Sequence, residues 1–358
     1  MFAMTNATAG NEIVTYSRAS DGTLTLLTTS KTRGLGIGVD TDTQGPLRLS
    51  HDNRFLYAVN PGSDNVTVFE VDGTRLKFLQ IIEAGDQPLS LTLSGELLYV
   101  LNGSVAGNGI RGFRVNADGT LTELPNSFRA LSSPIAVPGE VRFSPDGRIL
   151  LVTHKMTNVL LTPENAIDAF TVGADGYASA MPLRNASAGL RPFSLAFRDD
   201  NKLVVVESSN AAPNLSAASS YQLNPDGTIT VISASVPNFQ TDICWVVITP
   251  DGRFAFTANF GSGTISSYSF APDGTLTLLN GSAASQGDTT QPVDLSLSAD
   301  GRFLYNLLRG AGAVAAFRIE NNASLTPLGT VVGALPVADG ASGLAAYQPG
   351  SSDAVTLS

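Results

Sequence analysis

The chain has 358 residues, of which 43% are hydrophobic and 15% charged, with a net charge of −10 and a pI near 4.6. This acidic balance argues against nucleic-acid binding and against docking on anionic membranes, because both need clustered Lys and Arg side chains. No run of 18 apolar residues is present to span a bilayer, and a single cysteine, Cys244, excludes an internal disulfide.

The chain begins with three short β-type runs, FAMTN (2–6), NEIVTYS (11–17) and GTLTLL (22–27), which turn residues separate. The stretch GLGIG (34–38) follows. Its glycines have the wrong spacing for a dinucleotide-binding loop, and they precede a strand instead of a helix. The first part of the chain therefore predicts strands of one sheet and no cofactor motif.

From residue 51 onward, one turn-and-strand element recurs, and its turn residue returns every 42 to 54 positions. The six copies are HDNRFLYAVN (51–60), SGELLYVLN (94–102), SPDGRILLVTH (144–154), RDDNKLVVVES (198–208), TPDGRFAFTAN (249–259) and SADGRFLYNLL (298–308). A second element of the type DGTLTLL follows the copies, for example at 72–79, 118–124, 226–232 and 273–279. Asp-Gly pairs between alternating apolar residues predict tight hairpins.

Each repeat of about 50 residues holds four short strands, which is typical of a β-propeller blade. The last run, GASGLAAYQ (340–348), resembles a first strand with no successor, while the chain start lacks a first strand. Pairing the two ends would cover an open sheet edge. The sequence therefore predicts an all-β, seven-bladed β-propeller with four antiparallel strands per blade, one blade being closed by both termini. We expect one domain over 1–348, a C-terminal tail over 349–358, and a monomer.

A ligand site is expected on one rim of the propeller. Loops that enter each innermost strand and loops that leave each second strand meet there, at the mouth of the central channel. Asn at several leaving positions is explained by its preference for turns. Charged side chains break this pattern at seven places: Glu140, His154, Lys155, Arg191, Glu207, Asp242 and Arg309.

Two interpretations of these charges remain open. In the first, three residues are catalytic and transfer protons: Glu140, His154 and Glu207. The other four bind a small-molecule ligand in the channel mouth: Lys155, Arg191, Asp242 and Arg309. In the second interpretation, the rim is solvated and carries ordinary ion pairs. Two histidines are too few for a three-histidine metal site, and no DxDxDG run is present, so we expect no metal and no cofactor.

The repeated SPDGRFLYxxN…DGTLT pattern resembles the lactonase family of seven-bladed β-propellers, which includes bacterial 6-phosphogluconolactonase and fungal 3-carboxymuconate cyclase-like enzymes. Its most typical stretch is ITPDGRFAFTANFGSGTISSYSFAPDGTLTLL (248–279), and the resemblance covers essentially the whole chain. It implies the propeller fold and a hydrolase or cyclase that acts on a small lactone.

The resemblance also implies catalytic positions that this chain does not match. Glu140 stands where the family has the His of a Gly-Pro-Arg-His segment, His154-Lys155 replaces an Asn-Glu pair, and Asn259-Phe260 replaces an Asn-Arg pair. We therefore expect hydrolysis or cyclisation of a small lactone or carboxylated molecule, divergent from 6-phosphogluconolactonase activity. The alternative is a non-catalytic, secreted binding propeller. Seven N-x-S/T sequons favour an extracellular or periplasmic location over the cytoplasmic alternative.

Overall fold

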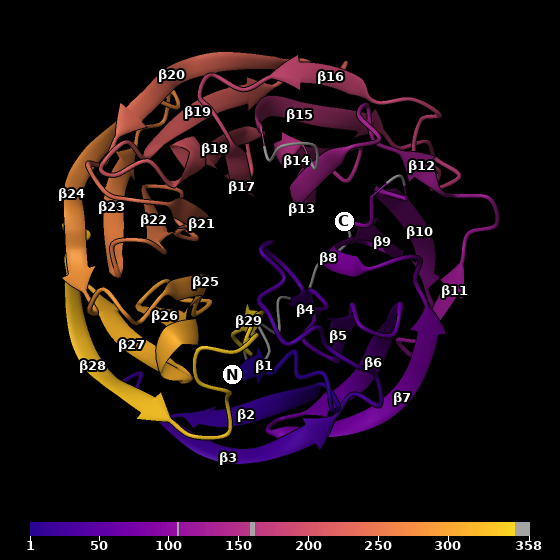
Figure 1. The fold of residues 1–358 in the computed structure, drawn as a ribbon, viewed down its shortest axis with the longest axis horizontal. Helices are drawn as coiled ribbons and strands as arrows, with labels where there is room; N and C mark the ends of the chain where they lie inside the picture. Colours follow the sequence, from indigo (N-terminus) through magenta and orange to yellow (C-terminus); the bar gives the residue numbers. More distant parts are fainter. Residues whose placement is uncertain (106, 158–161, 348–358) are drawn as a thin grey trace, which may run out of the picture.

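The computed structural model describes residues 1–105, 107–157 and 162–347. Seven antiparallel sheets stand around a central axis, each with strands arranged in sequence from the axis outward (Figure 1). Six of these blades have four strands, and blade 3 has a short fifth strand on its outer side. The predicted all-β, seven-bladed propeller is confirmed.

Blade 1 contains β29 (Leu344–Ala345), β1 (Phe2–Met4), β2 (Glu12–Arg18) and β3 (Leu24–Lys31); blade 2 contains β4 (Leu47–Leu49), β5 (Phe55–Asn60), β6 (Asn65–Asp72) and β7 (Arg75–Glu83). Blade 3 contains β8 (Pro88–Ser94), β9 (Leu97–Asn102), β10 (Gly109–Val115), β11 (Leu121–Glu123) and β12 (Arg129–Ala130). Blade 4 contains β13 (Ala136–Phe143), β14 (Ile149–Thr157), β15 (Pro163–Thr171) and β16 (Leu183–Ala186). Blade 5 contains β17 (Pro192–Phe197), β18 (Lys202–Glu207), β19 (Ala217–Leu223) and β20 (Ile229–Pro237). Blade 6 contains β21 (Ile243–Ile248), β22 (Phe254–Asn259), β23 (Thr264–Phe270) and β24 (Leu276–Ser285); blade 7 contains β25 (Pro292–Leu297), β26 (Phe303–Leu308), β27 (Ala313–Ile319) and β28 (Leu325–Val332). Two short 3₁₀ helices, η1 (Ser209–Ala211) and η2 (Arg309–Ala311), complete the described elements.

Both termini build blade 1, as predicted. The innermost strand β29 pairs antiparallel with β1, with Phe2 opposite Ala345 and Ala3 opposite Leu344, and Figure 1 shows the N-terminus beside it. The predicted C-terminal tail, 349–358, lies outside the described residues.

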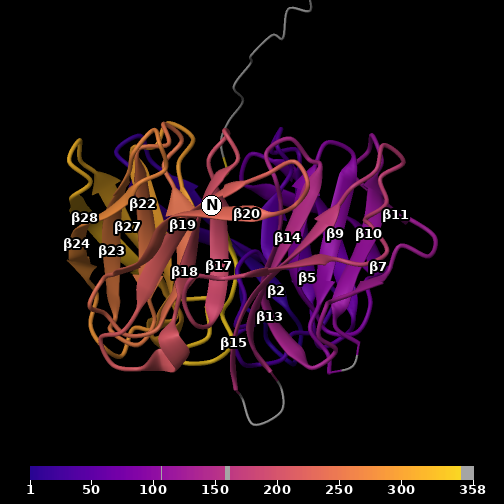
Figure 2. The same cartoon turned by 90° about the horizontal axis from the view of Figure 1, so that it is seen from above.

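The inner strands run roughly along the propeller axis, whereas the outermost strands run around the circumference (Figure 1 and Figure 2). The molecule therefore has two ends along this axis. We call the end that carries the turns between first and second strands the hairpin face. The opposite end, where the chain enters each first strand, is the rim face. The predicted ligand positions belong to the rim face.

The SPDGR element forms a hairpin turn on the hairpin face. In blade 4, the Ser144 hydroxyl and the Arg148 backbone N–H both donate to the carboxylate of Asp146, at 2.6 and 3.2 Å. Gly147 takes the left-handed conformation, with φ of 70°, and donates to the Ser144 carbonyl. The element is therefore a self-contained turn, which explains its recurrence without any chemical role.

The DGT element forms the outer hairpin of each blade and joins it to its neighbour. Asp118 accepts a hydrogen bond from the Thr120 N–H at 3.0 Å and so closes the turn in blade 3. Tyr57 of blade 2 donates its hydroxyl to the carbonyl of Gly119 in that turn, also at 3.0 Å. Tyr99 and Tyr305 make the same contact with the next blades along. The two repeated elements thus hold successive blades together.

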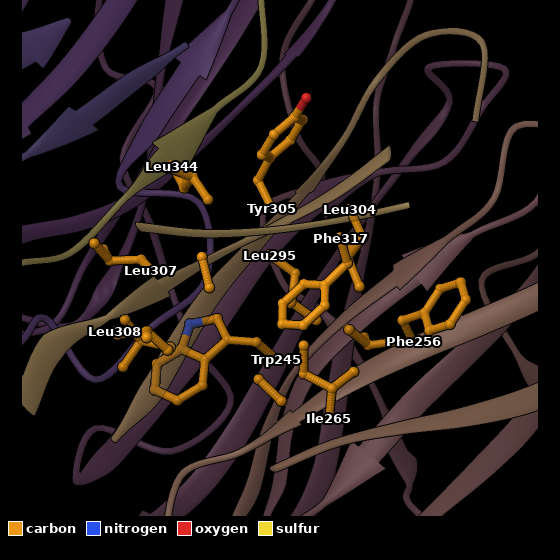
Figure 3. Packing of buried hydrophobic residues seen from close by; sticks show 14 of the residues in the cluster. Trp245, Phe256, Ile265, Leu295, Leu304, Tyr305, Leu307, Leu308, Phe317 and Leu344 are labelled. Atoms are coloured by element: carbon orange, nitrogen blue, oxygen red, sulfur yellow. The ribbon is translucent and has the colours of Figure 1, made fainter. Parts of the chain in front are cut away.

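The hydrophobic core lies between the blades. Trp245 on β21 is buried between Phe193 of blade 5 and the apolar side chains of blade 7 (Figure 3). In Figure 3, Phe256 and Ile265 of blade 6 and Leu295 of blade 7 are part of the same cluster. Because each sheet buries both faces against its neighbours, the inner and second strands are apolar along most of their length.

Candidate functional site

Backbone strain marks the rim face at the point where several first strands begin. Gln87, Arg191, Asp242 and Gln291 each occupy the last position before a first strand, and each has a φ between 50° and 58°. This left-handed conformation costs a residue with a side chain about 1–2 kcal/mol. It directs the Arg191 and Asp242 side chains from neighbouring blades toward each other, and strain of this kind often accompanies a functional site.

Six charged residues gather at the channel mouth, and we call them the rim cluster: Asp40, Asp42, Lys155, Arg191, Asp242 and Arg309. The Lys155 ammonium lies 2.5 Å from the Asp42 carboxylate, and the Arg309 guanidinium lies 3.0 Å from that of Asp40. Arg191 and Asp242 are 3.6 Å apart, beyond hydrogen-bond distance. The cluster brings together all four predicted substrate-binding residues.

Among the described residues, the Arg191 guanidinium makes no hydrogen bond, whereas Lys155 donates to Asp42 and Arg309 donates to Gln291. The Nε of Arg191 is buried and has no hydrogen-bond partner among the described residues. Burial raises the pKa of the facing Asp242 carboxyl, although the positive charge of Arg191 opposes the shift. Burial and the nearby Asp42 carboxylate likewise raise the pKa of Asp40. At the mouth, carboxyl groups with raised pKa values therefore lie next to an arginine whose guanidinium N–H groups are not all hydrogen-bonded.

Aromatic rings lie beneath these cations. The Lys155 ammonium is 4.6 Å from the ring centroid of Phe193, and the Arg309 guanidinium is 5.8 Å from that of Phe260. Trp245 lies between the two rings, at 5.1 and 6.3 Å. Cation–π contacts of this kind hold the charged side chains in place at the mouth.

Sequence reasoning missed Asp40 and Asp42. Both belong to the segment 32–46, which connects β3 to β4 and crosses the channel mouth. From this segment the Thr43 carbonyl accepts a hydrogen bond from Trp245 Nε1 at 3.3 Å. The available signal was the acidic run VDTDTQ (39–44) ahead of a first strand.

Glu140, a predicted catalytic residue, lies inside the channel wall on β13. Its Oε1 accepts hydrogen bonds from Arg48 at 2.8 Å and Arg142 at 3.1 Å. Its Oε2 accepts the backbone N–H of Leu195 on β17 at 2.9 Å. The side chain is fully buried and links blade 4 to blade 5.

His154, the second predicted catalytic residue, is buried within blade 4. Its Nε2 lies 3.0 Å from Asp168 and its Nδ1 lies 3.4 Å from Glu164, both on β15. Burial disfavours the charged imidazolium, but hydrogen bonds to the two carboxylates outweigh this and raise the pKa of His154. Both ring nitrogens are therefore committed to protein partners.

Glu207, the third, is buried at the end of β18. Its carboxylate accepts hydrogen bonds from the hydroxyls of Ser219 and Ser235 and from the Gly189 N–H at 3.0 Å. Burial raises the pKa of this carboxyl despite those bonds. The three predicted catalytic residues thus lie in three separate networks, and the structure does not bring them together. Their catalytic roles stay predictions.

The family model described as "Lactonase, 7-bladed beta-propeller" matches residues 9–138 and 178–294, which together are more than half of the chain. The chain belongs to the lactonase family of seven-bladed β-propellers. The match leaves out 139–177, the segment of blade 4 that carries Glu140, His154 and Lys155. The match also leaves out residues 1–8 and 295–358, which include Arg309.

Solved structures share the propeller at low sequence identity. A putative 6-phosphogluconolactonase from Bacteroides fragilis is 20% identical, with a TM-score of 0.69 over 96% of this chain and 97% of its own. A periplasmic gluconolactonase from Pseudomonas aeruginosa is 17% identical, with a TM-score of 0.66 over 95% and 98%. A functionally unknown protein from Desulfotomaculum acetoxidans is 15% identical, with a TM-score of 0.66 over 95% and 98%. No curated protein matches the sequence.

In the part of the chain that the structure describes, no three His, Cys, Asp or Glu side chains are placed to hold a metal ion. Within the same residues, no helix has the length and hydrophobicity to cross a membrane.

Proposed function

We propose that the protein hydrolyses a small carboxylated lactone at the rim cluster. The observation that supports this is the pair formed by Arg191 and Asp242. A guanidinium with unused donors faces a carboxylate whose basicity burial increases, at the mouth of the channel. A general base beside an oxyanion-stabilising cation is what ester hydrolysis needs.

The proposed reaction uses water as the nucleophile. Asp242 accepts a proton from water as the water oxygen attacks the lactone carbonyl, and Arg191 stabilises the oxyanion that forms. The ring C–O bond then breaks, and the proton returns from Asp242 to the ring oxygen, which leaves a hydroxy acid. Lys155 and Arg309 bind the carboxylate of the substrate. The buried Glu140, His154 and Glu207 hold the strands that carry these groups.

The family and its solved relatives suggest the substrates to test. Two of the similar structures bear the names of enzymes for sugar lactones, gluconolactone and 6-phosphogluconolactone. Of the two, one is periplasmic, and together with the seven sequons this supports our inference of an extracellular or periplasmic location. Immunoblotting of cell fractions from the native host would test the location.

A non-catalytic binding propeller is the second candidate, and one observation favours it. Asp42 and Asp40 of the segment 32–46 already neutralise Lys155 and Arg309. A ligand that displaced these carboxylates would be bound at the mouth without being turned over.

A pH-stat assay on gluconolactone, 6-phosphogluconolactone and carboxylated five-membered lactones separates the two candidates. We expect Asp242→Asn and Arg191→Met each to lower the rate at least about 100-fold, in the range of a lost acid–base or oxyanion group. The matched control is the exposed pair on the hairpin face, as Asp300→Asn and Arg302→Met, which should leave the rate unchanged. A wild-type protein that turns over no lactone of the panel would refute the hydrolase proposal.

A further inference from the structure

A cavity opens into the channel from the hairpin face. It has a volume of about 290 Å³, and the ends of the first strands line it, including Leu49, Phe197, Ile248 and Leu297. These strand ends are partly exposed, whereas residues at the rim-face end of the same strands are buried. The cavity is therefore distinct from the rim cluster.

Gln44 separates the cavity from the channel mouth. Its side-chain carbonyl accepts the Val246 N–H at 2.9 Å, and its amide nitrogen lies 3.3 Å from Glu140 Oε1. A buried amide thus spans from blade 6 to blade 4 across the channel. The rim cluster lies on one side of it and the cavity on the other.

Arg48 and Arg142 give the cavity its chemistry. Both guanidiniums donate to the same oxygen, Glu140 Oε1, at 2.8 and 3.1 Å, while the other carboxylate oxygen is taken by Leu195. Neither guanidinium makes another hydrogen bond to a described residue. Each guanidinium has five N–H donors, and both side chains remain about a quarter exposed, 26% and 28%, toward the cavity. Most of these donors are therefore free to meet an acceptor.

The charge balance at the cavity favours an anion. Burial and the neighbouring Arg142 lower the pKa of Arg48 to about 10, which still leaves it cationic at neutral pH. Two arginines thus face one carboxylate, Glu140. The other acid in the wall is Asp294, whose pKa burial raises to about 7, so that it is partly protonated at neutral pH. A guanidinium binds a carboxylate well because two of its N–H groups match the two carboxylate oxygens.

The remaining wall restricts the size and character of the ligand. Val247, Leu295 and Leu344 contribute apolar surface, while Ser296 supplies a hydroxyl. A cavity of this size suits a small organic molecule, and a wall of mixed polarity suits a short carbon chain with hydroxyl groups.

We propose that the hairpin-face cavity is a binding site for a small hydroxycarboxylate, held through its carboxylate by Arg48 and Arg142. The site is independent of the hydrolase proposed at the rim cluster, and it uses residues on the other side of Gln44. One of the two arginines, Arg142, belongs to the segment 139–177 that the family model does not match.

Isothermal titration and thermal shift with gluconate, citrate and inorganic phosphate test this proposal. We expect saturable binding of at least one of the two hydroxycarboxylates to the wild type. Arg142→Met should weaken that binding at least tenfold, and Arg142→Lys, which keeps the charge but loses the planar pair of donors, should weaken it less. Arg302→Met, an exposed arginine on the same face, is the matched control and should bind like the wild type.

The rim variant Arg191→Met distinguishes this cavity from the proposed hydrolase site. It should bind the hydroxycarboxylate as the wild type does. Loss of binding in Arg191→Met but not in Arg142→Met would overturn the proposal, and so would a lack of saturable binding to the wild type. Saturable binding of phosphate, but of neither hydroxycarboxylate, would also overturn the proposal, because the ligand would then be a free inorganic anion. Circular dichroism of each variant checks that the propeller is folded.

Discussion

The carboxylate of Asp294 accepts a hydrogen bond from the backbone N–H of Gly343 at 2.8 Å. Asp294 lies on the first strand of blade 7, and Gly343 immediately precedes β29, the strand that the C-terminal part of the chain adds to blade 1. The bond therefore lies across the junction where the ring closes. Glu140 makes the equivalent contact between blades 4 and 5.

Replacing Asp294 by Asn should make stability less dependent on pH. Burial raises the pKa of this carboxyl to about 7 from an ordinary value of 3.8. The folded state consequently binds more protons than the unfolded state between about pH 4 and pH 7, and its stability falls as the pH rises through that window. The expected loss is on the order of 4 kcal/mol for a shift of this size.

Asn keeps the acceptor for Gly343 but cannot ionise, so Asp294→Asn should not show this loss. Urea denaturation at pH 4.5, 6 and 7.5 measures the difference. Asp300→Asn, at an exposed position, is the control and should follow the wild type over this range. If the free energy of unfolding changed with pH equally in the wild type and in Asp294→Asn, Asp294 would not be the group with the raised pKa.

The outer turn of blade 3 should not tolerate a side chain at its glycine, Gly119. In Gly119→Ala, a Cβ would come within 2.1 Å of the Phe55 ring, and the residue has a φ of +85°. We expect a loss of more than about 3 kcal/mol from strain and overpacking together. Gly73→Ala is the matched control, because its φ is +60° but no atom lies within 4 Å of the new Cβ.

The control should cost only about 1 kcal/mol of backbone strain. Thermal unfolding of the two variants compares them directly. Similar losses would show that the contact between neighbouring blades does not limit the turn.

The fold could be predicted from the sequence because its determinants are local and repeated. The turn at 144–148 is closed by hydrogen bonds to the side chain of its own Asp146, and Asp-Gly turns recur at a similar spacing. The three strands at the start of the chain, which lack a first strand, and the lone first strand at its end were sufficient to indicate how the ring closes. Such signals need no knowledge of contacts between distant residues.

The site was only partly predictable, because some of its contacts join residues that are far apart in the sequence. Rim position alone indicated Lys155, Arg191 and Asp242, since a strand end fixes where a side chain lies. Asp42 contacts Lys155 across 113 residues of sequence, through a segment that belongs to neither strand. Sequence periodicity cannot describe such a crossing. The isolated Asp168 within the apolar run AIDAF (166–170) was a readable signal for a buried partner of His154, but its partner was not apparent from spacing.

His154 should stabilise the protein through its charge. Its pKa is raised above 6.5, because the carboxylates of Asp168 and Glu164 outweigh the effect of burial. The stabilisation is therefore fully present below about pH 6.5 and is lost as the pH rises through the higher folded-state value. In His154→Gln the buried Asp168 loses its cation, whereas Glu164 keeps Arg184 at 3.1 Å, and we expect a loss of about 3–5 kcal/mol at pH 6.

The loss in His154→Gln should shrink at alkaline pH. His51→Gln is the matched control, since His51 is the other histidine of the chain and is exposed. Urea midpoints between pH 6 and pH 9 give the comparison. A pH-independent difference would mean that the imidazole is neutral and acts by packing alone.

Gln44 offers a test of how tightly the channel is divided. In Gln44→Leu, the buried Val246 N–H loses its acceptor, which should cost about 1–3 kcal/mol. Gln44→Glu restores an acceptor but places a second carboxylate beside Glu140, at the position where the amide nitrogen now lies 3.3 Å away. Repulsion between the two raises the pKa of the new carboxyl in the folded state. Gln44→Glu should therefore be most stable, relative to the wild type, near pH 4 to 5, and should lose stability as the pH rises to 7.5.

Unfolding is followed by the fluorescence of the single tryptophan, Trp245, whose indole N–H donates to the neighbouring Thr43 carbonyl. If Gln44→Glu matched the wild type at every pH, the two carboxylates would have to be separated by water, and Gln44 would not seal the channel.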